Sequence, residues 1–381
     1  MRICFFSTDW TSEPVPDLEA TKLTGKPQFI PGKQRLAFGG TFLTRGAMPG
    51  MELKKHGYDC FLSWRIESQP DGTIRAIDTN GEWSTPDAIW IQRQMQTGFD
   101  ESIRKARANG QVLLNDLDDS FGNGVLPTTN LAHQTTDPDA NPDFNRVHYY
   151  RNLAASSAVT VSTQALYREM QVLGVPVYLL RNQINLEQWP QLDPAAVDIL
   201  GWIGGVQWRA RDLQQFRPWL NEWLADTGWG FYHGGNSQVP DVPKAWDLAG
   251  IDTREVEVTT APLCHIAEYP RLWRNLGVSL IPLEDCRFNH AKSSLKALES
   301  SACGLPFIAS DLPEQRWFVE HGGAGRLVKR GNPRAWMRHL DELLDPEVRR
   351  AEGQKNREHA EQFDIAHTWR QWADVFDEVA A

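Results

Sequence analysis

Short apolar runs alternate with amphipathic stretches along most of the chain. Each run has the length of a β-strand, and many stretches between them carry apolar residues at helical spacing, as at Leu213, Phe216 and Leu220. The runs lie at 2–7, 58–64, 87–92, 112–115, 159–161 and 175–180, and then at 199–203, 229–232, 256–259, 278–283, 306–310 and 325–328. Strands that alternate with helices, twice over, predict an α/β protein with two Rossmann-like, doubly wound parallel-sheet domains.

Polar segments interrupt this alternation at three places. Residues 8–35 are polar and rich in proline, which favours a long functional loop over a simple turn. Residues 70–84 contain the turn pairs Asp71–Gly72 and Asn80–Gly81, which indicate a hairpin or loop. Residues 123–145 are rich in Asn, Pro, Asp and Thr, and we expect a long loop there that covers the mouth of a cleft.

Composition and charge narrow the class of protein. A chain of 381 residues is long enough for two domains with full cores. The net charge is −10: residues 1–183 carry 18 basic and 20 acidic residues, and the remainder carries 21 and 29. No basic block marks a nucleic-acid-binding surface, which argues against tight non-specific DNA binding. The sequence leaves open the alternative of a locally positive groove in the first half of the chain.

Cysteine usage and hydropathy indicate the compartment. The five cysteines show no C-x-x-C pairing, and a reduced, cytoplasmic chain is the simplest interpretation. The first residues lack a long apolar segment, and no apolar run approaches the roughly 18 residues of a membrane-spanning helix. We therefore expect neither a signal peptide nor a membrane span, while peripheral membrane contact stays open.

The stretch from Phe288 to Pro306 carries the strongest candidate chemistry. Its apolar spacing predicts a helix over residues 292–302, which would place Lys292 and Glu299 on one face, about 10 Å apart along the axis. A helix N-terminus with Lys292 and two serines suits a diphosphate, and a carboxylate two turns further could accept hydrogen bonds from ribose hydroxyls. The alternative is an amphipathic helix whose charged face is merely solvated.

The run FN..KS..K..E..A.G.P..ASD, which ends at Asp311, resembles the donor-binding segment of nucleotide-sugar glycosyltransferases with the GT-B fold. The similarity is to the retaining family 4 and its relatives, in particular a branch with Asn-x-x-Lys-Ser in the donor loop. It covers nearly the whole chain and is strongest at 277–330. One departure is clear, because many members have a glutamate eight residues before the position of Glu299, and this chain has Ala291.

The resemblance implies a binding function for each of the two domains. Residues 1–183 would bind the acceptor, residues 198–360 would bind the nucleotide-sugar donor, and a helix in 361–381 would pack back on the first domain. Gly39 and Gly40 would approach the donor phosphates, which glycine permits because it has no side chain, although a plain turn explains them equally well. Arg45 would face the cleft and bind the acceptor.

Carboxylates follow the expected strand at 112–115, in the string Asp116-Leu117-Asp118-Asp119. Clustered carboxylates can bind Mg²⁺ or Mn²⁺, and one of them could instead cap the next segment. The carboxyl end of a strand is also where ligands bind in a doubly wound sheet. The resemblance favours this last interpretation, with Asp118 or Asp119 binding the acceptor or acting as a base, and it implies no metal.

The second domain begins with a strand and the glycine turn Gly204–Gly205, an arrangement that holds phosphates in Rossmann-like units. The resemblance implies that a basic residue just beyond the turn reaches the diphosphate, either Arg209 or, as the alternative, Arg211. His233 could contact the nucleotide or be structural. The residues expected at the donor are Gly39, Gly40, Gly204, Gly205, Arg209, His233, Asn289, Lys292, Ser293, Ser294 and Glu299.

The resulting hypothesis is a glycosyltransferase that moves a sugar from a UDP- or GDP-type donor to a hydroxyl of a glycan or glycoconjugate. We expect retention at the anomeric carbon and neither a metal nor a separate cofactor. The catalytic residues would be Asp118, Asp119, Lys292 and Arg209, and the cations would stabilise the departing diphosphate. Arg45 and Asp119 would bind the acceptor.

Other classes of protein stay open. One is a phage-type glycosyltransferase whose acceptor is DNA or a protein. Another is a non-catalytic protein that binds sugar nucleotides or glycans, an interpretation that Ala291 in place of a carboxylate allows. A phosphorylase is less favoured, because nothing in the sequence suggests a lysine that carries pyridoxal phosphate.

Overall fold

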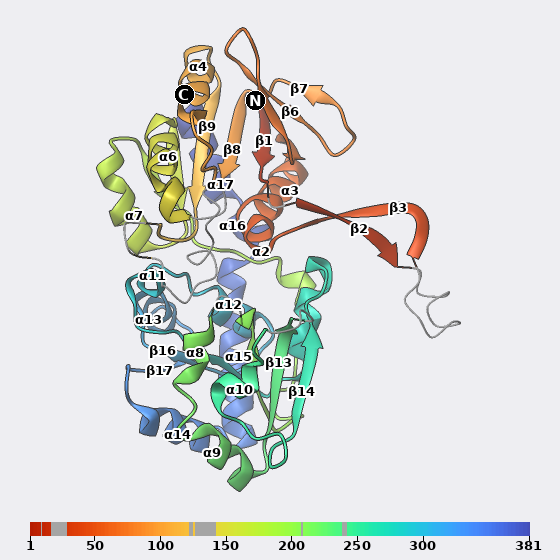
Figure 1. Ribbon diagram of the computed structural model, residues 1–381, viewed down its shortest axis with the longest axis vertical. Helices are drawn as coiled ribbons and strands as arrows, with labels where there is room; N and C mark the ends of the chain where they lie inside the picture. Colours follow the sequence, from red (N-terminus) through yellow and green to blue (C-terminus); the bar gives the residue numbers. More distant parts are fainter. Residues whose placement is uncertain (9, 17–28, 122–124, 126–141, 207–208, 238–241) are drawn as a thin grey trace.

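The computed structural model describes residues 1–8, 10–16, 29–121, 125, 142–206, 209–237 and 242–381. Two parallel sheets, each packed with helices, are stacked along the long axis of the molecule (Figure 1). The sheets lie in the first and second halves of the chain, which confirms the α/β fold with two Rossmann-like domains that the alternating pattern predicts.

The first sheet has six parallel strands in the order β11-β10-β9-β8-β1-β4. They are β1 (Arg2–Phe6), β4 (Asp59–Ser63), β8 (Ala88–Gln92), β9 (Val112–Leu117), β10 (Ala158–Val161) and β11 (Val177–Leu179). Successive residues of β1 point to opposite faces, so that Phe5 packs with the α3 residue Leu53 and Phe6 with the α4 residue Ile103. Helices on both faces explain why such strands are continuous apolar runs.

The second sheet also has six parallel strands, in the order β14-β13-β12-β15-β16-β17. They are β12 (Ile199–Ile203), β13 (Gly230–Asn236), β14 (Val258–Pro262), β15 (Val278–Ile281), β16 (Phe307–Ser310) and β17 (Arg326–Val328). The strand order reverses between β12 and β15. Ligands bind at such switch points in doubly wound sheets, at the carboxyl ends of the strands.

Helices connect the strands in both domains. In the first domain they are α2 (Gly40–Phe42), a π-helical turn (Leu43–Ala47), α3 (Met48–Lys55), α4 (Phe99–Ala108), α6 (Pro142–Ala155) and α7 (Gln164–Met170), with a 3₁₀ turn at Gln171–Leu173. In the second they are α8 (Ala210–Gln214), α9 (Leu220–Thr227), α10 (Ala245–Ala249), a 3₁₀ segment (Ile266–Asn275), α11 (Arg287–His290), α12 (Leu295–Ala302), α13 (Pro313–Glu320), α14 (Pro333–Glu342) and α15 (Pro346–Ala360). Further 3₁₀ turns lie at Leu186–Gln188 and Glu361–Phe363.

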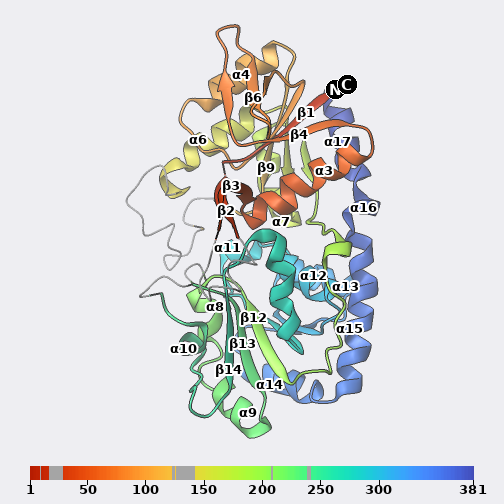
Figure 2. The same ribbon diagram turned by 90° about the vertical axis from the view of Figure 1, so that its right-hand side faces the viewer.

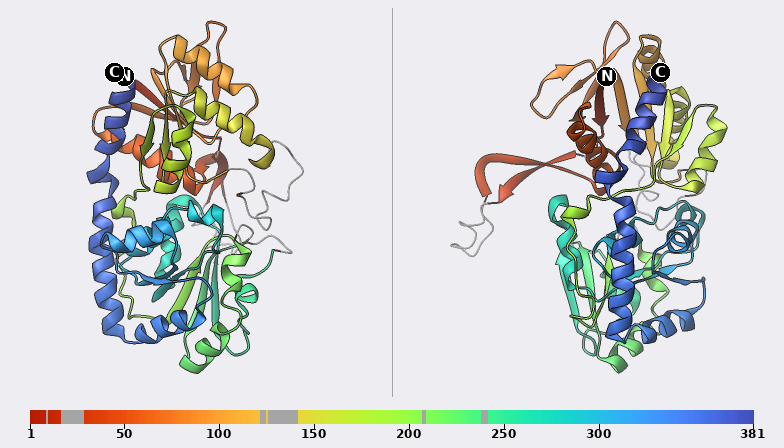
Figure 3. Two further views of the ribbon diagram at one scale, coloured as in Figure 1. Left: turned by 90° about the vertical axis from the view of Figure 1, so that its left-hand side faces the viewer. Right: turned by 180° about the vertical axis from the view of Figure 1, so that it is seen from behind.

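The end of the chain returns to the first domain. Helix α15 lies along the second domain, and α16 (Ile365–Thr368) and α17 (Arg370–Ala380) continue along the first, as Figures 2 and 3 show in blue. Trp372 Nε1 donates a hydrogen bond to Gln183 Oε1 (2.9 Å), and the ring of Phe376 packs against Phe5. The predicted crossing of the last helix is therefore confirmed.

Two antiparallel strands, β2 (Trp10–Pro16) and β3 (Phe29–Phe38), stand where a loop was expected over residues 8–35. The loop prediction is wrong for these strands, which project from the first domain (Figure 1). Proline is tolerated on edge strands, and both strands of a two-stranded ribbon are edges, so the prolines that suggested a loop do not exclude this structure. By contrast, β5 (Ile66–Ser68), β6 (Ile74–Ile77) and β7 (Trp83–Ser84) confirm the hairpin expected at 70–84.

Three other expectations change. The helix expected through Leu213 and Leu220 is divided into α8 and α9, with Pro218 between them, because proline cannot continue the hydrogen-bond pattern of a helix. The helix expected over residues 292–302 begins only at Leu295. The loop expected at 123–145 lies mostly outside the described residues, and 142–145 belong to α6. Within the described part of the chain, no helix has the length and apolar character needed to cross a membrane.

Candidate active site

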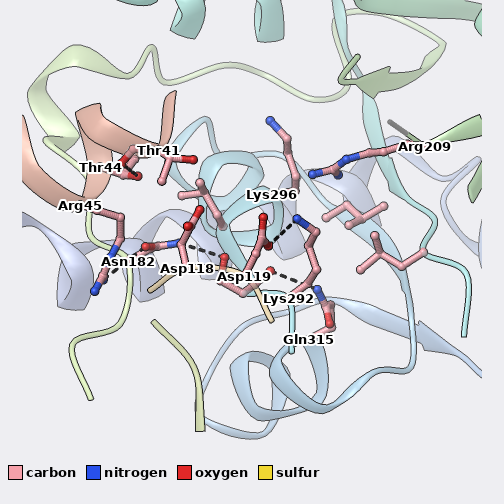
Figure 4. Close-up of a pocket in the computed structure, with 14 residues that line it drawn as sticks. Thr41, Thr44, Arg45, Asp118, Asp119, Asn182, Arg209, Lys292, Lys296 and Gln315 are labelled. Carbon is pink, nitrogen blue, oxygen red and sulfur yellow. Dashed lines mark hydrogen bonds and ion pairs between the residues drawn. The ribbon is translucent and has the colours of Figure 1, made fainter. Parts of the chain in front are cut away.

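A pocket of about 130 Å³ lies between the two domains, at the carboxyl ends of their sheets (Figure 4). The first domain contributes residues that follow β9, and the second contributes residues that follow β12 and β15, the two strands of the switch point. A substrate is therefore expected here. The charged residues that line the pocket are Arg45, Asp118, Asp119, Arg209, Lys292 and Lys296.

Lys292 and Asp119 meet across the gap between the domains. The Lys292 ammonium lies 2.7 Å from Asp119 Oδ1, and it also lies over the ring of Phe288. Burial favours the neutral acid, but the Lys292 ammonium and the Arg93 guanidinium outweigh it and hold the pKa of Asp119 below its usual value. Asp119 is thus an ionised carboxylate, and it pairs with Lys292, the cation expected to bind a phosphate.

Lys292 reaches Asp119 because of the turn that precedes α12. The short helix α11 ends at His290, and the chain turns before Leu295 begins α12, so Lys292 lies outside the helix and not on the same face as Glu299. Thr163 Oγ1 donates to the carbonyl oxygen of Ala291 (3.0 Å). These contacts fix the turn against the first domain.

Asp118 differs from its neighbour in the direction of its pKa shift and in its partners. Its Oδ1 atom is buried and has no hydrogen-bond partner within the described part of the chain, and the Nε atom of Arg93 lies 3.8 Å away. Burial raises the pKa of Asp118, and the nearby carboxylates of Asp119 and Asp116 add to the rise, while Arg93 opposes it. Adjacent carboxyl groups with pKa values shifted in opposite directions are typical of acid–base sites.

Arg93 was not identified from the sequence. It directly follows β8, and its φ of 47° makes it the one non-glycine residue with left-handed backbone among those described. This conformation costs an arginine about 1 kcal/mol or more, whereas glycine adopts it freely. The only available signal was its position directly after an apolar strand.

Arg209 directly precedes α8 and lines the pocket from the second domain, whereas Asp118 and Asp119 line it from the first (Figure 4). Among the described residues, its guanidinium makes no hydrogen bond or ion pair. The labelled side chains in Figure 4 show Arg209, Lys292 and Lys296 near one another. Three cations around a pocket suit an anionic ligand such as a diphosphate. The alternative, Arg211, instead pairs with Glu284 (3.0 Å).

Glu299 is buried in a cluster with Lys296 and Tyr269. Its Oε2 atom accepts hydrogen bonds from Lys296 Nζ and from the Tyr269 hydroxyl, each at 2.8 Å. Burial lowers the pKa of Lys296, and Glu299 opposes this shift. Glu299 does not line the pocket, whereas Lys296 does. The expected contact with ribose stays a prediction. In this structure one carboxylate oxygen of Glu299 already accepts two hydrogen bonds.

Several residues expected at the donor have structural contacts. Asn289 donates to the backbone oxygen of Glu284 (2.9 Å), and neither it nor His233 lines the pocket. Nε2 of the buried His233 lies 2.9 Å from the carbonyl oxygen of Gly204, so the histidine holds the glycine turn. Burial lowers the pKa of His233 and favours the neutral ring, while the hydrogen bond with Gly204 opposes this shift.

Of the remaining residues expected at the donor, Ser293 lines the pocket, and the glycines and Ser294 lie around it. Gly39 precedes α2, and Gly40 lies beside Ile266 of the second domain, where a Cβ atom would be 3.9 Å from the isoleucine side chain. Gly205 follows Gly204 after β12. Ser293 lines the pocket, and its hydroxyl accepts a hydrogen bond from Asn182 (2.8 Å). Ser294 occupies the position before α12.

Arg45 lines the pocket, but its guanidinium is buried and fully hydrogen-bonded. Nε and Nη2 bind the two carboxylate oxygens of Asp116 (3.1 and 2.5 Å), and Nη1 donates to the backbone oxygen of Leu180. Both side chains of the pair are at most 1% exposed. This geometry indicates a structural pair, and acceptor binding by Arg45 stays a prediction.

Polar residues from several segments complete the pocket and could not be identified from the sequence. Thr41, Thr44, Asn182 and Gln315 line it, and each is a common polar residue with no motif around it. Only the fold brings them together. Within the described ranges, no group of three or more His, Cys, Asp or Glu side chains could hold a metal ion.

Comparison with known proteins supports the same class of fold. Residues 199–346 match the family described as Glycosyl transferases group 1. The D-inositol 3-phosphate glycosyltransferase of Thermobispora bispora is 34% identical over 119 residues, which are 31% of this chain and 26% of that protein. The matched segment thus spans about a quarter of the length of this curated relative.

Two solved structures resemble the whole chain. Sucrose-phosphate synthase from Thermosynechococcus elongatus has a TM-score of 0.63 at 15% identity and covers 100% of this chain and 99% of its own. Anabaena HepE, solved in complex with UDP-glucose, has a TM-score of 0.58 at 14% identity, with 99% and 100% covered. The chain therefore has the GT-B fold.

Proposed function

We propose that the protein is a glycosyltransferase that uses a nucleotide-diphosphate sugar. One observation carries the proposal: Arg209, Lys292 and Lys296 of the second domain line a pocket that Asp118 and Asp119 close from the first domain. The family match over residues 199–346 covers the domain that contributes the three cations, and HepE, which shares the fold, was solved with UDP-glucose. The donor would bind against the second domain and the acceptor against the first.

In the proposed reaction the acceptor oxygen forms a bond to the anomeric carbon, and the bond from that carbon to the β-phosphate oxygen breaks. The departing diphosphate takes the electron pair, and Lys292 and Arg209 stabilise its charge. The hydroxyl proton passes to Asp118, whose pKa burial raises toward that of a working base. We infer that no metal is needed, because two or three cationic side chains supply the charge that a metal would.

Retention at the anomeric carbon and a glycan or glycoconjugate acceptor are part of the proposal and rest on the resemblance at residues 288–311. A cytoplasmic site of action is also part of the proposal and rests on the cysteine usage. Ala291 stands where many family 4 members have a carboxylate near the donor sugar. Its side chain is buried, and its carbonyl oxygen accepts the hydrogen bond from Thr163. That position therefore supports the interface between the domains and cannot contact a sugar through a carboxylate.

Thermal stabilisation by nucleotides tests the proposed function. We expect UDP or GDP, and the matching nucleotide sugar, to raise the melting temperature with ligand concentration, with and without EDTA, because a ligand of the native state stabilises it. ADP and CMP serve as comparison ligands. A shift that requires Mg²⁺ would contradict metal-free binding. No shift with any nucleotide would contradict donor use and favour a protein that binds glycans only.

Replacing Asp119 with asparagine is expected to tighten the binding of the nucleoside diphosphate while it lowers sugar transfer. The Asp119 carboxylate lies 2.7 Å from Lys292 and competes with a phosphate for the ammonium. Removing its charge should lower Kd by about threefold to tenfold, a free-energy change of about 1 kcal/mol. Isothermal titration calorimetry with UDP and GDP measures this. Asp285→Asn, an equal charge change at an exposed pair with His290, should leave Kd unchanged. An unchanged or weaker affinity in D119N would contradict competition for Lys292.

A further inference from the structure

Arg93 combines a strained backbone with a functional position. Its amide donates to the carbonyl oxygen of Asp116 (3.3 Å), which holds the residue beside the end of β9. With a φ of 47°, glycine would fit this place without cost. Backbone strain of this kind persists where the surrounding structure enforces it, and it concentrates at functional sites. The side chain, rather than the backbone, is therefore the reason to expect an arginine here.

The Arg93 guanidinium lies between two carboxylates of the pocket. Nε is 3.8 Å from Asp118 Oδ1, and Nη1 is 3.9 Å from Asp119 Oδ2. These distances exceed those of hydrogen bonds, so the guanidinium acts on both aspartates through charge and leaves the lone pairs of Asp118 Oδ1 available. The Arg93 side chain is 31% exposed, so it is not a buried packing residue.

Asp118 has two kinds of charged neighbour, and they shift its pKa in opposite directions. Asp116 and Asp119 favour its neutral form, while Arg93 and Lys292 favour its ionised form. The buried hydroxyl of Tyr149 has no hydrogen-bond partner within the described ranges, and burial and the charge of Asp118 raise its pKa. When a diphosphate engages Lys292, that cation is shared with the phosphate. Arg93 is then the nearest charge that keeps Asp118 able to accept a hydrogen bond.

We propose that Arg93 is a positioning residue of the acceptor side of the site: it keeps Asp118 ionised and oriented to accept a hydrogen bond from the hydroxyl of the acceptor. This inference rests on the proposed function and adds a residue to it. The ligand of this subsite is a neutral hydroxyl group, because an anionic acceptor group would be repelled by Asp118 and Asp119.

The first test compares Arg93→Gly with Arg93→Lys. In R93G the melting temperature should be unchanged or higher by about 1–3 °C, because the backbone strain is relieved. Arg104→Gly, the same chemical change inside α4, should lower it. The affinity for UDP should stay within twofold of the wild type in both Arg93 variants. A fall of more than about 5 °C in R93G would show a packing role and overturn the proposal.

The second test measures the pKa of the Asp118 carboxyl group directly. Carbon-13 NMR of aspartate labelled at the carboxyl carbon should show a pKa of Asp118 raised by at least one unit in R93G, because the charge that opposes the rise is gone, and near the wild-type value in R93K. The rate at which UDP is released from UDP-glucose, or GDP from GDP-mannose, should fall more than tenfold in R93G. The acid limb of the pH–rate profile should move to higher pH. R93K should recover much of the rate.

The outcomes separate the two proposals. If the wild type released no nucleotide from either donor, the proposed function would fail, while the carboxyl titration would still decide whether Arg93 controls Asp118. If the wild type turned over and R93G matched it in rate and in pH profile, the role of Arg93 alone would be refuted.

Discussion

Lys292→Met is expected to lower kcat by about a hundredfold with a donor that the wild type turns over. In the proposed reaction the ammonium stabilises the departing diphosphate, because Lys292 lines the pocket from the turn before α12 and faces Asp119 of the first domain. Removing one preorganised donor to a developing negative charge costs roughly 10²–10³ in rate. Steady-state rates of nucleotide release at saturating donor measure the effect.

Two control variants distinguish the loss of the Lys292 charge from a loss of the fold. Lys105→Met removes an ammonium of the same kind from an exposed pair with Glu101 and should leave kcat unchanged. Lys292→Arg keeps the charge and should retain part of the rate, because a guanidinium is larger and more rigid than an ammonium. If K292M kept the wild-type kcat at saturating donor, Lys292 would have no role in stabilising the departing diphosphate.

Much of the fold could be predicted from the sequence, because strands that are covered on both faces must be apolar throughout. Residues 87–92 and 306–310 are such runs, and β8 and β16 lie there. The ribbon β2–β3 could not be predicted this way. Both of its strands are edge strands, and edge strands tolerate the prolines and polar residues that normally indicate a loop.

The candidate site was predictable in part. Asp118, Asp119, Arg209 and Lys292 could be identified because each follows a strand or precedes a helix in a way that Rossmann-like domains use, and all four line one pocket. Their pairing could not be predicted, because Asp119 and Lys292 are 173 residues apart and belong to different domains.

Local spacing also misled the prediction at one point. Helical periodicity placed Lys292 and Glu299 on one face, but the chain turns at residues 291–294 and sends Lys292 toward the first domain. Glu299 stays on α12 and pairs with Lys296, three residues away, as neighbours on a helix do. A turn that depends on contacts with another domain, such as the bond from Thr163 to Ala291, leaves no periodic signal in the sequence.

Arg45→Met is expected to lower the free energy of unfolding of the first domain by about 3–5 kcal/mol, the cost of leaving one partner of a buried ion pair alone. Asp116 would keep the hydrogen bond from Thr160 (2.6 Å) and lose both bonds from the guanidinium. The carboxylate is almost completely buried, so water cannot replace them. The shift of the urea midpoint, followed by circular dichroism, measures the loss.

The same substitution probes why the end of the chain returns to the first domain. The guanidinium of Arg45 also lies 5.3 Å from the ring of Trp372 in α17, so its loss should loosen this helix, and protease cleavage within residues 361–381 should become faster. Arg104→Met, which breaks a pair with Asp100 whose arginine is 57% exposed, is the matched control and should cost less than about 1 kcal/mol. Equal losses in the two variants would refute the structural role of Arg45, and they would leave its guanidinium free to serve the acceptor, as the sequence first suggested.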